Sequence, residues 1–209
     1  MRESTGRSTG NPAGAEVRWL AWLLVVGGSI GTVVSGALLV EKIALLQDPA
    51  YVPSCSINPV LSCGSVMSTE QAAVFGFPNP VLGVTGFAVV TTVGTALLAG
   101  ASFHRWFWLG LQSGTIAGAG FVHWLIFQSL YRIGALCPYC MAVWTVTIPV
   151  FWYVTLFAVS AGHLPVPASA RRVVGILAGY HGVVLTGWFL LVVVLVTQRF
   201  WSLWSALLS

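Results

Sequence analysis

Long apolar intervals, separated by isolated charged residues, make up most of this chain. A helix of roughly 20 apolar residues crosses the hydrocarbon core of a bilayer and satisfies its own backbone polar groups there. The intervals that reach this length are residues 19–40, 71–104, 106–131, 133–170 and 173–198. The pattern therefore predicts an all-α integral membrane protein with five transmembrane helices, near residues 19–43, 80–100, 106–129, 137–159 and 176–198.

Residues 1–15, MRESTGRSTGNPAGA, differ from the rest in composition. They are rich in Gly, Ser and Thr and have no apolar period, which predicts a disordered cytoplasmic tail. Residues 16–209 then form a single membrane domain. The first apolar run is too long for the central region of a signal peptide, and no convincing small-x-small cleavage site follows it. We therefore interpret it as a retained membrane anchor.

Charge is scarce in this chain, and its sign is unevenly distributed. Nine Lys and Arg against five Asp and Glu give a net charge of +4. Short cytoplasmic segments of membrane proteins carry an excess of Lys and Arg. This bias predicts a cytoplasmic N-terminus and an external C-terminus. The net charge therefore indicates topology, and we expect a plasma-membrane protein in contact with lipid and not with nucleic acid. The inner segments would hold Arg2, Arg7, Arg18, Arg105, Arg171 and Arg172, and the outer ones Lys42, Arg132 and Arg199.

The four cysteines occur as two pairs. Cys55 and Cys63 lie in the outer loop 44–79, and Cys137 and Cys140 open the fourth helix within LCPYCM. The predicted topology places all four on the oxidising side of the membrane, where disulfides persist. A C-x-x-C loop is too short to gain much as a structural staple. A helix N-terminus also favours the reactive thiolate. The pattern favours an electron relay, with Cys140 pointing into the bundle and Cys137 toward the loop.

Other uses of the cysteines are weighed against this relay. Two structural disulfides on a non-enzymatic membrane scaffold would fit the same spacing. A zinc site needs four thiolates in a tetrahedron, and C-x7-C combined with C-x2-C is an unusual spacing for one, so no metal is predicted. Covalent haem attachment would need a histidine where Met141 stands. A conduit for reducing power from the cytosol would need thiols at the inner face, where the predicted topology places none.

The outer loop 44–79 is too long for a simple connector. Within it, GSVMSTEQAAVFGF groups apolar residues on either side of a polar block, Ser68–Gln71. This grouping predicts a short amphipathic helix, capped by Ser65 or Ser68, that forms a lid over the C-x-x-C pair. A stripe of glycines in the third helix is predicted to pack closely against a neighbouring helix, and it consists of Gly110, Gly114 and Gly118.

The spacing, order and topology of the cysteines resemble those of the vitamin K epoxide reductase family, over about residues 18–160. The resemblance implies a four-helix bundle that encloses a quinone, with an accessory fifth helix. Bacterial members oxidise a thioredoxin-fold partner outside the membrane and pass the electrons to a membrane quinone. This chain looks like a form whose partner is a separate protein. Its actinobacterial appearance favours menaquinone over ubiquinone.

By position, the resemblance implies that Cys55 and Cys63 are a shuttle pair and Cys137 and Cys140 the active-site pair. Asn79 matches a family position that hydrogen-bonds the quinone carbonyl, although Asn between two prolines is also an ordinary turn residue. Trp144 stands where the vertebrate enzyme has a tyrosine with the same role, and its indole can donate but not accept. The expected reaction is oxidation of a dithiol by a quinone. A quinone or quinone epoxide reduced as the main product remains an alternative.

Overall fold

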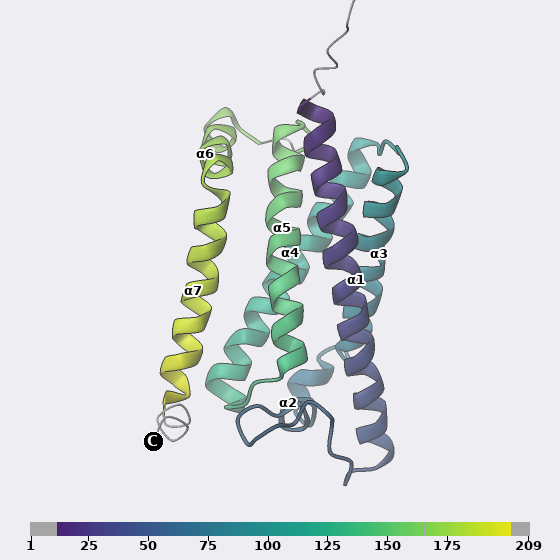
Figure 1. Ribbon diagram of the computed structural model, residues 1–209, viewed down its shortest axis with the longest axis vertical. Coiled ribbons are helices and arrows are strands. Elements are labelled where there is room, and N and C mark those ends of the chain that lie inside the picture. The colour runs from purple at the N-terminus through teal and green to yellow at the C-terminus, as the bar shows by residue number, and fades with distance from the viewer. Residues whose placement is uncertain (1–11, 165, 202–209) are drawn as a thin grey trace, which may run out of the picture.

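The computed structural model describes residues 12–164 and 166–201, which form a bundle of long helices (Figure 1). The long helices are α1 (Pro12–Gln47), α3 (Pro80–Leu98), α4 (Arg105–Phe127), α5 (Pro138–Ser160) and α7 (His181–Arg199). Shorter segments are α2 (Cys63–Met67), the 3-10 helix η1 (Glu70–Ala73), the π-helix η2 (Gln128–Ile133) and α6 (Ala168–Gly179). Across the described residues the only β-type pairing is an isolated parallel bridge between Leu61 and Leu136. The predicted all-α membrane class is confirmed.

Length and apolar composition qualify four of the helices to cross a membrane. These are α1 over Glu16–Gln47, α3, α5 and α7. The remaining long helix, α4, has 23 residues, as α5 does, but it contains Arg105, Gln112 and His123, which are more polar than the Thr, Tyr and Ser residues of α5. Two of them bind neighbouring helices: Gln112 Nε2 donates to Thr155 Oγ1 on α5 at 2.8 Å, and His123 Nε2 accepts from Trp188 Nε1 on α7 at 2.9 Å. The polar residues of α4 therefore tie it to its neighbours within the bundle.

Two predicted boundaries are wrong. The first helix begins at Pro12, so residues 12–15 of the predicted tail are helical, while residues 1–11 lie outside the described part of the chain. Proline suits the first helical turn, where its missing N–H leaves no bond unmade. The last predicted helix, 176–198, is interrupted at Tyr180 between α6 and α7. Gly179 and Gly182 flank this break, and glycine is among the weakest helix formers.

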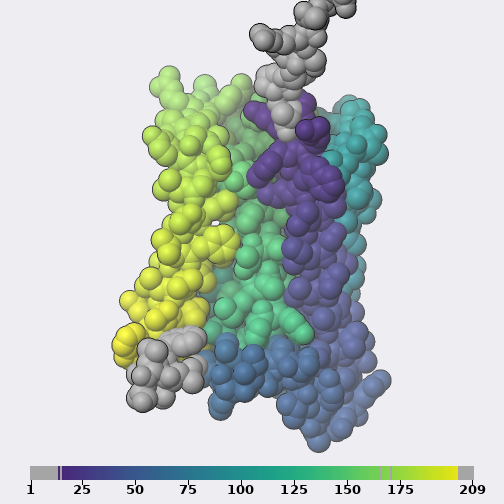
Figure 2. Space-filling model, in the orientation of Figure 1, coloured from purple at the N-terminus to yellow at the C-terminus, as the bar shows by residue number. Residues whose placement is uncertain are grey.

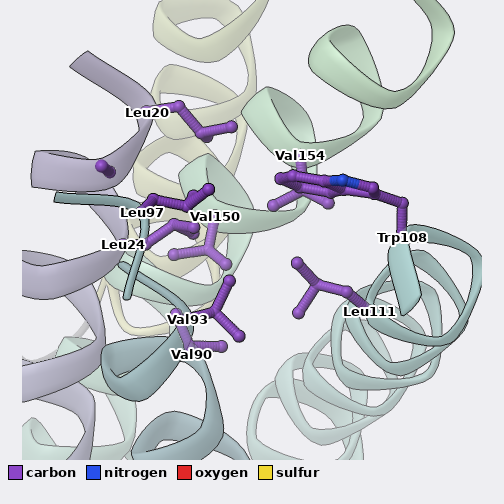
Figure 3. Packing of buried hydrophobic residues seen from close by; sticks show 10 residues of the cluster. Leu20, Leu24, Val90, Val93, Leu97, Trp108, Leu111, Val150 and Val154 are labelled. Atoms are coloured by element: carbon purple, nitrogen blue, oxygen red, sulfur yellow. The ribbon is translucent and has the colours of Figure 1, made fainter. Parts of the chain in front are cut away.

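The tightest helix packing is between α1 and α3. A Cβ atom at Gly94 of α3 would lie 2.7 Å from the backbone nitrogen of Val25, and one at Gly28 of α1 would lie 2.7 Å from the backbone nitrogen of Thr91. Small residues let helices in a membrane approach closely and gain van der Waals contact. A buried cluster continues this contact to α4 and α5 (Figure 3); its labelled members are Leu20, Leu24, Val90, Val93, Leu97, Trp108, Leu111, Val150 and Val154.

The bundle has two chemically different ends. At the cysteine end, α1 finishes, the loop with α2 crosses the bundle, and α5 begins (Figures 1 and 2). At the opposite end, α1 starts and α3 turns into α4. The accessory helix α7 docks at the cysteine end, where Arg199 Nε donates to Leu130 O at 2.8 Å and the Phe200 side chain is buried. All the thiol chemistry is therefore gathered at one end.

Candidate functional site

Both predicted cysteine pairs lie in one buried cluster at the cysteine end. Cys55 and Cys63 form a disulfide, while Cys137 and Cys140 are free thiols. The Sγ atoms of Cys63 and Cys137 are 3.0 Å apart, and both side chains have no exposed surface. The sulfur that opens α5 thus touches the disulfide of the loop, which is the arrangement that thiol–disulfide exchange requires.

A short stretch of backbone pairing sets this contact. Leu136 N donates to Val60 O at 2.7 Å, and Ser62 N donates to Leu136 O at 2.9 Å. These bonds form the parallel bridge between Leu61 and Leu136. Since Ser62 precedes Cys63 and Leu136 precedes Cys137, the pairing brings the two cysteines side by side.

The chain reaches this position through an unusual end to α4. The helix continues as the π-helix η2, and Gly134 follows it with φ of 69°, in the left-handed region that glycine adopts without strain. Ser129 O accepts a hydrogen bond from Gly134 N at 3.0 Å, which closes the turn. Local π-helical turns often occur at functional sites. Here the turn directs residues 135–137 back across the mouth of the bundle.

Cys137 is the N-cap residue of α5, and its sulfur accepts a hydrogen bond from Cys140 N at 3.4 Å. A hydrogen bond from the Cys140 thiol lowers the pKa of Cys137 below its ordinary value. Backbone N–H groups of Cys140 and Tyr139 act in the same direction, against the opposing effect of burial. The helix N-terminus therefore favours the thiolate at Cys137, the residue that touches the disulfide.

The predicted amphipathic helix of the outer loop is wrong in extent and in its cap. The segment forms two short helices, α2 and η1, and the cap is Ser62, whose hydroxyl accepts from Ser65 N at 3.2 Å. Ser68 Oγ donates to Gly64 O and Thr69 Oγ1 donates to Val66 O, both at 2.8 Å. Side-chain bonds of this kind compete with the helical backbone pattern, so α2 ends after Met67.

A metal site at the cysteines was weighed from the sequence. The sulfurs of Cys55, Cys63 and Cys137 lie within 4.8 Å of one another, but Cys140 is not in this group. Two of the three sulfurs are joined to each other as the disulfide. A zinc-type site uses separate thiolates as ligands. The described cluster therefore has the form of an exchange site.

A cavity of about 530 Å³ begins at the C-x-x-C pair and runs between α1, α3, α4 and α5. Cys140 and Trp144, one turn apart on α5, line it near the cysteine end. Trp144 Nε1 is buried and has no hydrogen-bond partner among the described residues. Burying such a donor without a partner is costly. A ligand that is largely apolar and carries an acceptor oxygen, as a quinone does, fits both the cavity and the indole.

The glycine stripe of α4 lines this cavity, so its predicted role in close helix packing is wrong. A Cβ atom at Gly110 or Gly114 would meet no described atom within 4 Å, and one at Gly118 would lie 3.8 Å from Thr147 Cγ2. The missing side chains leave room for a ligand along α4. The close-packing glycines are those between α1 and α3.

Asn79 also lines the cavity, but its side chain binds the outer loop. Its Nδ2 donates to Gln71 O at 2.7 Å, and its Oδ1 accepts from Val74 N at 3.2 Å. This is the turn role expected of Asn between prolines. Two buried serines that also line the cavity, Ser35 and Ser129, were not identified from the sequence. Ser35 was visible as a hydroxyl within an apolar run, whereas Ser129 follows Gln128 and gave no such signal.

Comparison with known families agrees with this geometry. The model of the vitamin K epoxide reductase family matches residues 22–155, which is more than half of the chain. The matched segment contains all four cysteines and every residue that lines the cavity. No curated protein matches the chain.

Proposed function

Because the chain belongs to the vitamin K epoxide reductase family, whose members are oxidoreductases acting on quinones and thiols, we propose that it generates disulfides outside the cytoplasm. The proposed substrate is the dithiol of a separate thioredoxin-fold protein, and the electron acceptor is a membrane quinone. A series of contacts supports the proposal. Cys63 Sγ of the disulfide lies 3.0 Å from Cys137 Sγ, Cys137 Sγ accepts a hydrogen bond from Cys140 N at 3.4 Å, and Cys140 lines the cavity.

The relay begins at the loop disulfide. A thiolate of the partner attacks Cys55, forms a mixed disulfide with it, and releases Cys63 as a thiolate. Cys63 then attacks Cys137 of a Cys137–Cys140 disulfide, which forms the Cys63–Cys137 bond and releases the Cys140 thiolate. The second partner thiol resolves the mixed disulfide and frees Cys55. Cys55 then attacks Cys63, restoring Cys55–Cys63 and leaving Cys137 and Cys140 as thiols.

The described state corresponds to the end of this sequence, with Cys55–Cys63 oxidised and Cys137 and Cys140 reduced. The remaining step returns the active-site pair to a disulfide and sends two electrons and two protons into the cavity. A quinone held beside Cys140 and Trp144 would supply the capacity to accept them. Cys140 lines the cavity and so is the proposed point of exit, while Trp144 Nε1 would donate a hydrogen bond to the acceptor oxygen.

Orientation in the membrane is proposed from the two ends of the bundle. Arg18, Arg105, Arg171 and Arg172 belong to segments at the end opposite the cysteines, and such basic residues favour the cytoplasmic side. The cysteine end would then face the outside of the plasma membrane, where an exported partner is accessible. Menaquinone is the first acceptor to test, because the actinobacterial appearance of the sequence favours it, and ubiquinone is the comparison.

The test uses the purified protein in detergent with a reduced thioredoxin-fold substrate. We expect the substrate to be oxidised only when quinone is added, with one quinol formed per disulfide. Replacing Cys140 by Ala should abolish quinol formation while a mixed disulfide at Cys55 still forms. Oxidation that proceeds equally without quinone, under anaerobic conditions, would contradict the proposal.

A further inference from the structure

Helix α1 continues to the cysteine end, where two consecutive charged residues bind the segment that carries the disulfide. The Glu41 carboxylate accepts hydrogen bonds from Tyr51 Oη at 2.8 Å and from the hydroxyl and backbone nitrogen of Ser54. Lys42 Nζ donates to Met67 O at 2.6 Å. Glu41 thus holds the residue directly before Cys55, and Lys42 holds the last residue of α2, the helix that begins with Cys63.

Glu41 and Lys42 both make hydrogen bonds in which one partner is charged. Hydrogen bonds in which one partner is charged are roughly twice as strong as those between neutral groups. Met67 O lies at the C-terminus of α2, where unpaired carbonyls attract a cation. Glu41 and Lys42 are only half-buried, but they are the charged residues of α1 that face this loop. In so apolar a chain, two adjacent charges bound to the loop point to a role in holding it.

The two anchors matter most when the disulfide is open. While Cys55 and Cys63 are bonded, each holds the other in place. Once a partner thiol has opened the bond, only non-covalent contacts hold each sulfur, and exchange depends on the effective concentration of one thiol near the other. The anchored α2 would keep Cys63 beside Cys137, which it already contacts at 3.0 Å. The anchored Ser54 would keep Cys55 within reach of Cys63.

We propose that Glu41 and Lys42 are positioning residues of the relay, with Lys42 holding Cys63 on Cys137 and Glu41 holding Cys55 near Cys63. The proposal rests on the relay described above for its biological meaning. Its test, however, involves neither quinone nor a protein partner. A failure to reduce quinone and a failure of this proposal are therefore separate results.

For Lys42, the experiment uses the full chain with Cys55→Ala and Cys140→Ala, which leaves Cys63 and Cys137 as the only thiols. The protein is equilibrated with glutathione and glutathione disulfide, then alkylated, and the Cys63–Cys137 bond is measured by mass spectrometry. The bond forms as glutathione disulfide is reduced to two glutathione thiols. Lys42→Met should lower the equilibrium constant for this bond about tenfold. Lys42→Arg should restore most of it.

For Glu41, the background is Cys137→Ala with Cys140→Ala, and the bond measured is Cys55–Cys63. Glu41→Ala should lower its equilibrium constant about fivefold to tenfold. The matched control is Asp48→Asn, an exposed carboxylate of the same loop that accepts only from Ala50 N in the described structure. This control should leave both equilibrium constants unchanged.

Thermal unfolding of each variant separates positioning from folding. A Lys42→Met protein that melts like its parent and forms the Cys63–Cys137 bond equally well overturns the proposal. If Lys42→Met does not fold, Lys42→Gln replaces it, because the amide still donates a weaker bond. A Lys42→Gln protein is expected to have a lower equilibrium constant for the Cys63–Cys137 bond than the parent, and an equilibrium constant equal to that of the parent overturns the proposal. Absence of the Cys63–Cys137 bond in the parent itself would overturn the relay order as well.

Discussion

Cys63 and Cys137 lie 74 positions apart in the chain, yet their Sγ atoms are 3.0 Å from each other. The contact depends on the isolated bridge between Leu61 and Leu136, which lies two residues before Cys63 and one residue before Cys137. Residues with little chemistry of their own therefore set the reactive geometry. The predictions below test this contact, the cavity beneath it and the side of the membrane on which both lie.

The order of the relay is tested by trapping its intermediate. In Cys55→Ala, Cys63 has lost its disulfide partner and should form a bond with Cys137, which it already contacts. We expect this bond to be the predominant disulfide in protein purified without reductant, as measured by non-reducing peptide mapping. In the wild-type protein, Cys55–Cys63 should predominate instead. A Cys55→Ala protein in which Cys63 pairs only with Cys140 would contradict the assigned order.

The side of the membrane is tested with a membrane-impermeant thiol reagent on intact cells. After reduction, we expect the reagent to reach the cysteine end from outside, because the basic residues favour the other end as the cytoplasmic one. A single cysteine placed at Ser102, in the turn between α3 and α4 at the opposite end, should react only after the cells are opened. The reverse pattern would contradict both the orientation and the proposed partner.

The lowered pKa of Cys137 predicts how the ionisation of its thiol depends on pH. A hydrogen bond from the Cys140 thiol lowers the pKa of Cys137, so the thiolate persists to lower pH than an ordinary cysteine would allow. In Cys140→Ala this donor is lost, the pKa of Cys137 rises, and its thiolate should then appear only at higher pH. Thiolate absorbance in the far ultraviolet, titrated against pH, measures this change. The double variant Cys137→Ala with Cys140→Ala supplies the baseline, and a Cys140→Ala titration at lower pH than in wild type would contradict the assignment.

The glycine stripe predicts where bulk can be tolerated on α4. Gly114→Leu would fill space in the cavity. Gly120→Leu is the comparison, because a Cβ atom at Gly120 also meets no described atom within 4 Å but the residue does not line this cavity. Both changes improve helix propensity equally. We therefore expect similar thermal stability, with quinone KM raised about tenfold or more only in Gly114→Leu. Equal KM values for the two variants would mean that the quinone does not lie along α4.

Much of this fold could be predicted because the apolar intervals of the sequence are long and are bounded by charged residues. Five apolar intervals of sufficient length gave the long helices, and the topology placed both cysteine pairs at one end. The glycine stripe could not be read correctly, because a small residue serves close packing and an open cavity equally well. The position of the neighbouring helix decides between the two. A Cβ atom added at Gly94 would lie 2.7 Å from a backbone atom of α1, whereas one added at Gly114 would meet no described atom within 4 Å.

The outer loop was harder to predict for a related reason. Its serine and threonine hydroxyls could cap a helix or end one, and Ser62 does the first while Ser68 does the second. The contacts of Glu41 and Lys42 depend on where the loop returns to α1, which no local pattern encodes. Their charge in an apolar helix was the only visible signal.

The cavity chemistry is tested most directly by a spectroscopic signal. In Cys137→Ala, Cys140 has no partner for a disulfide and lines the cavity beside Trp144. A thiolate at Cys140 in contact with a bound quinone would place an electron-rich sulfur against an electron-poor ring. We expect a visible charge-transfer band that disappears on acidification, because protonation removes the donor, and that disappears when quinone is stripped from the protein.

Trp144→Phe, made in the same background, removes the unpaired indole N–H. It should weaken quinone binding about fivefold, equivalent to roughly 1 kcal/mol for a lost hydrogen bond.

The matched control for that variant is Trp152→Phe. Trp152 lies on the same helix and its Nε1 is also buried without a partner among the described residues, but it does not line the cavity. Its replacement should leave the band and the quinone affinity unchanged. If both tryptophan variants weaken the band equally, the effect comes from α5 as a whole and not from a hydrogen bond to the ring. If Cys137→Ala binds quinone with Cys140 ionised and gives no band, the ring does not contact Cys140. Electrons would then have to leave the relay at Cys137, the only other cysteine of the pair.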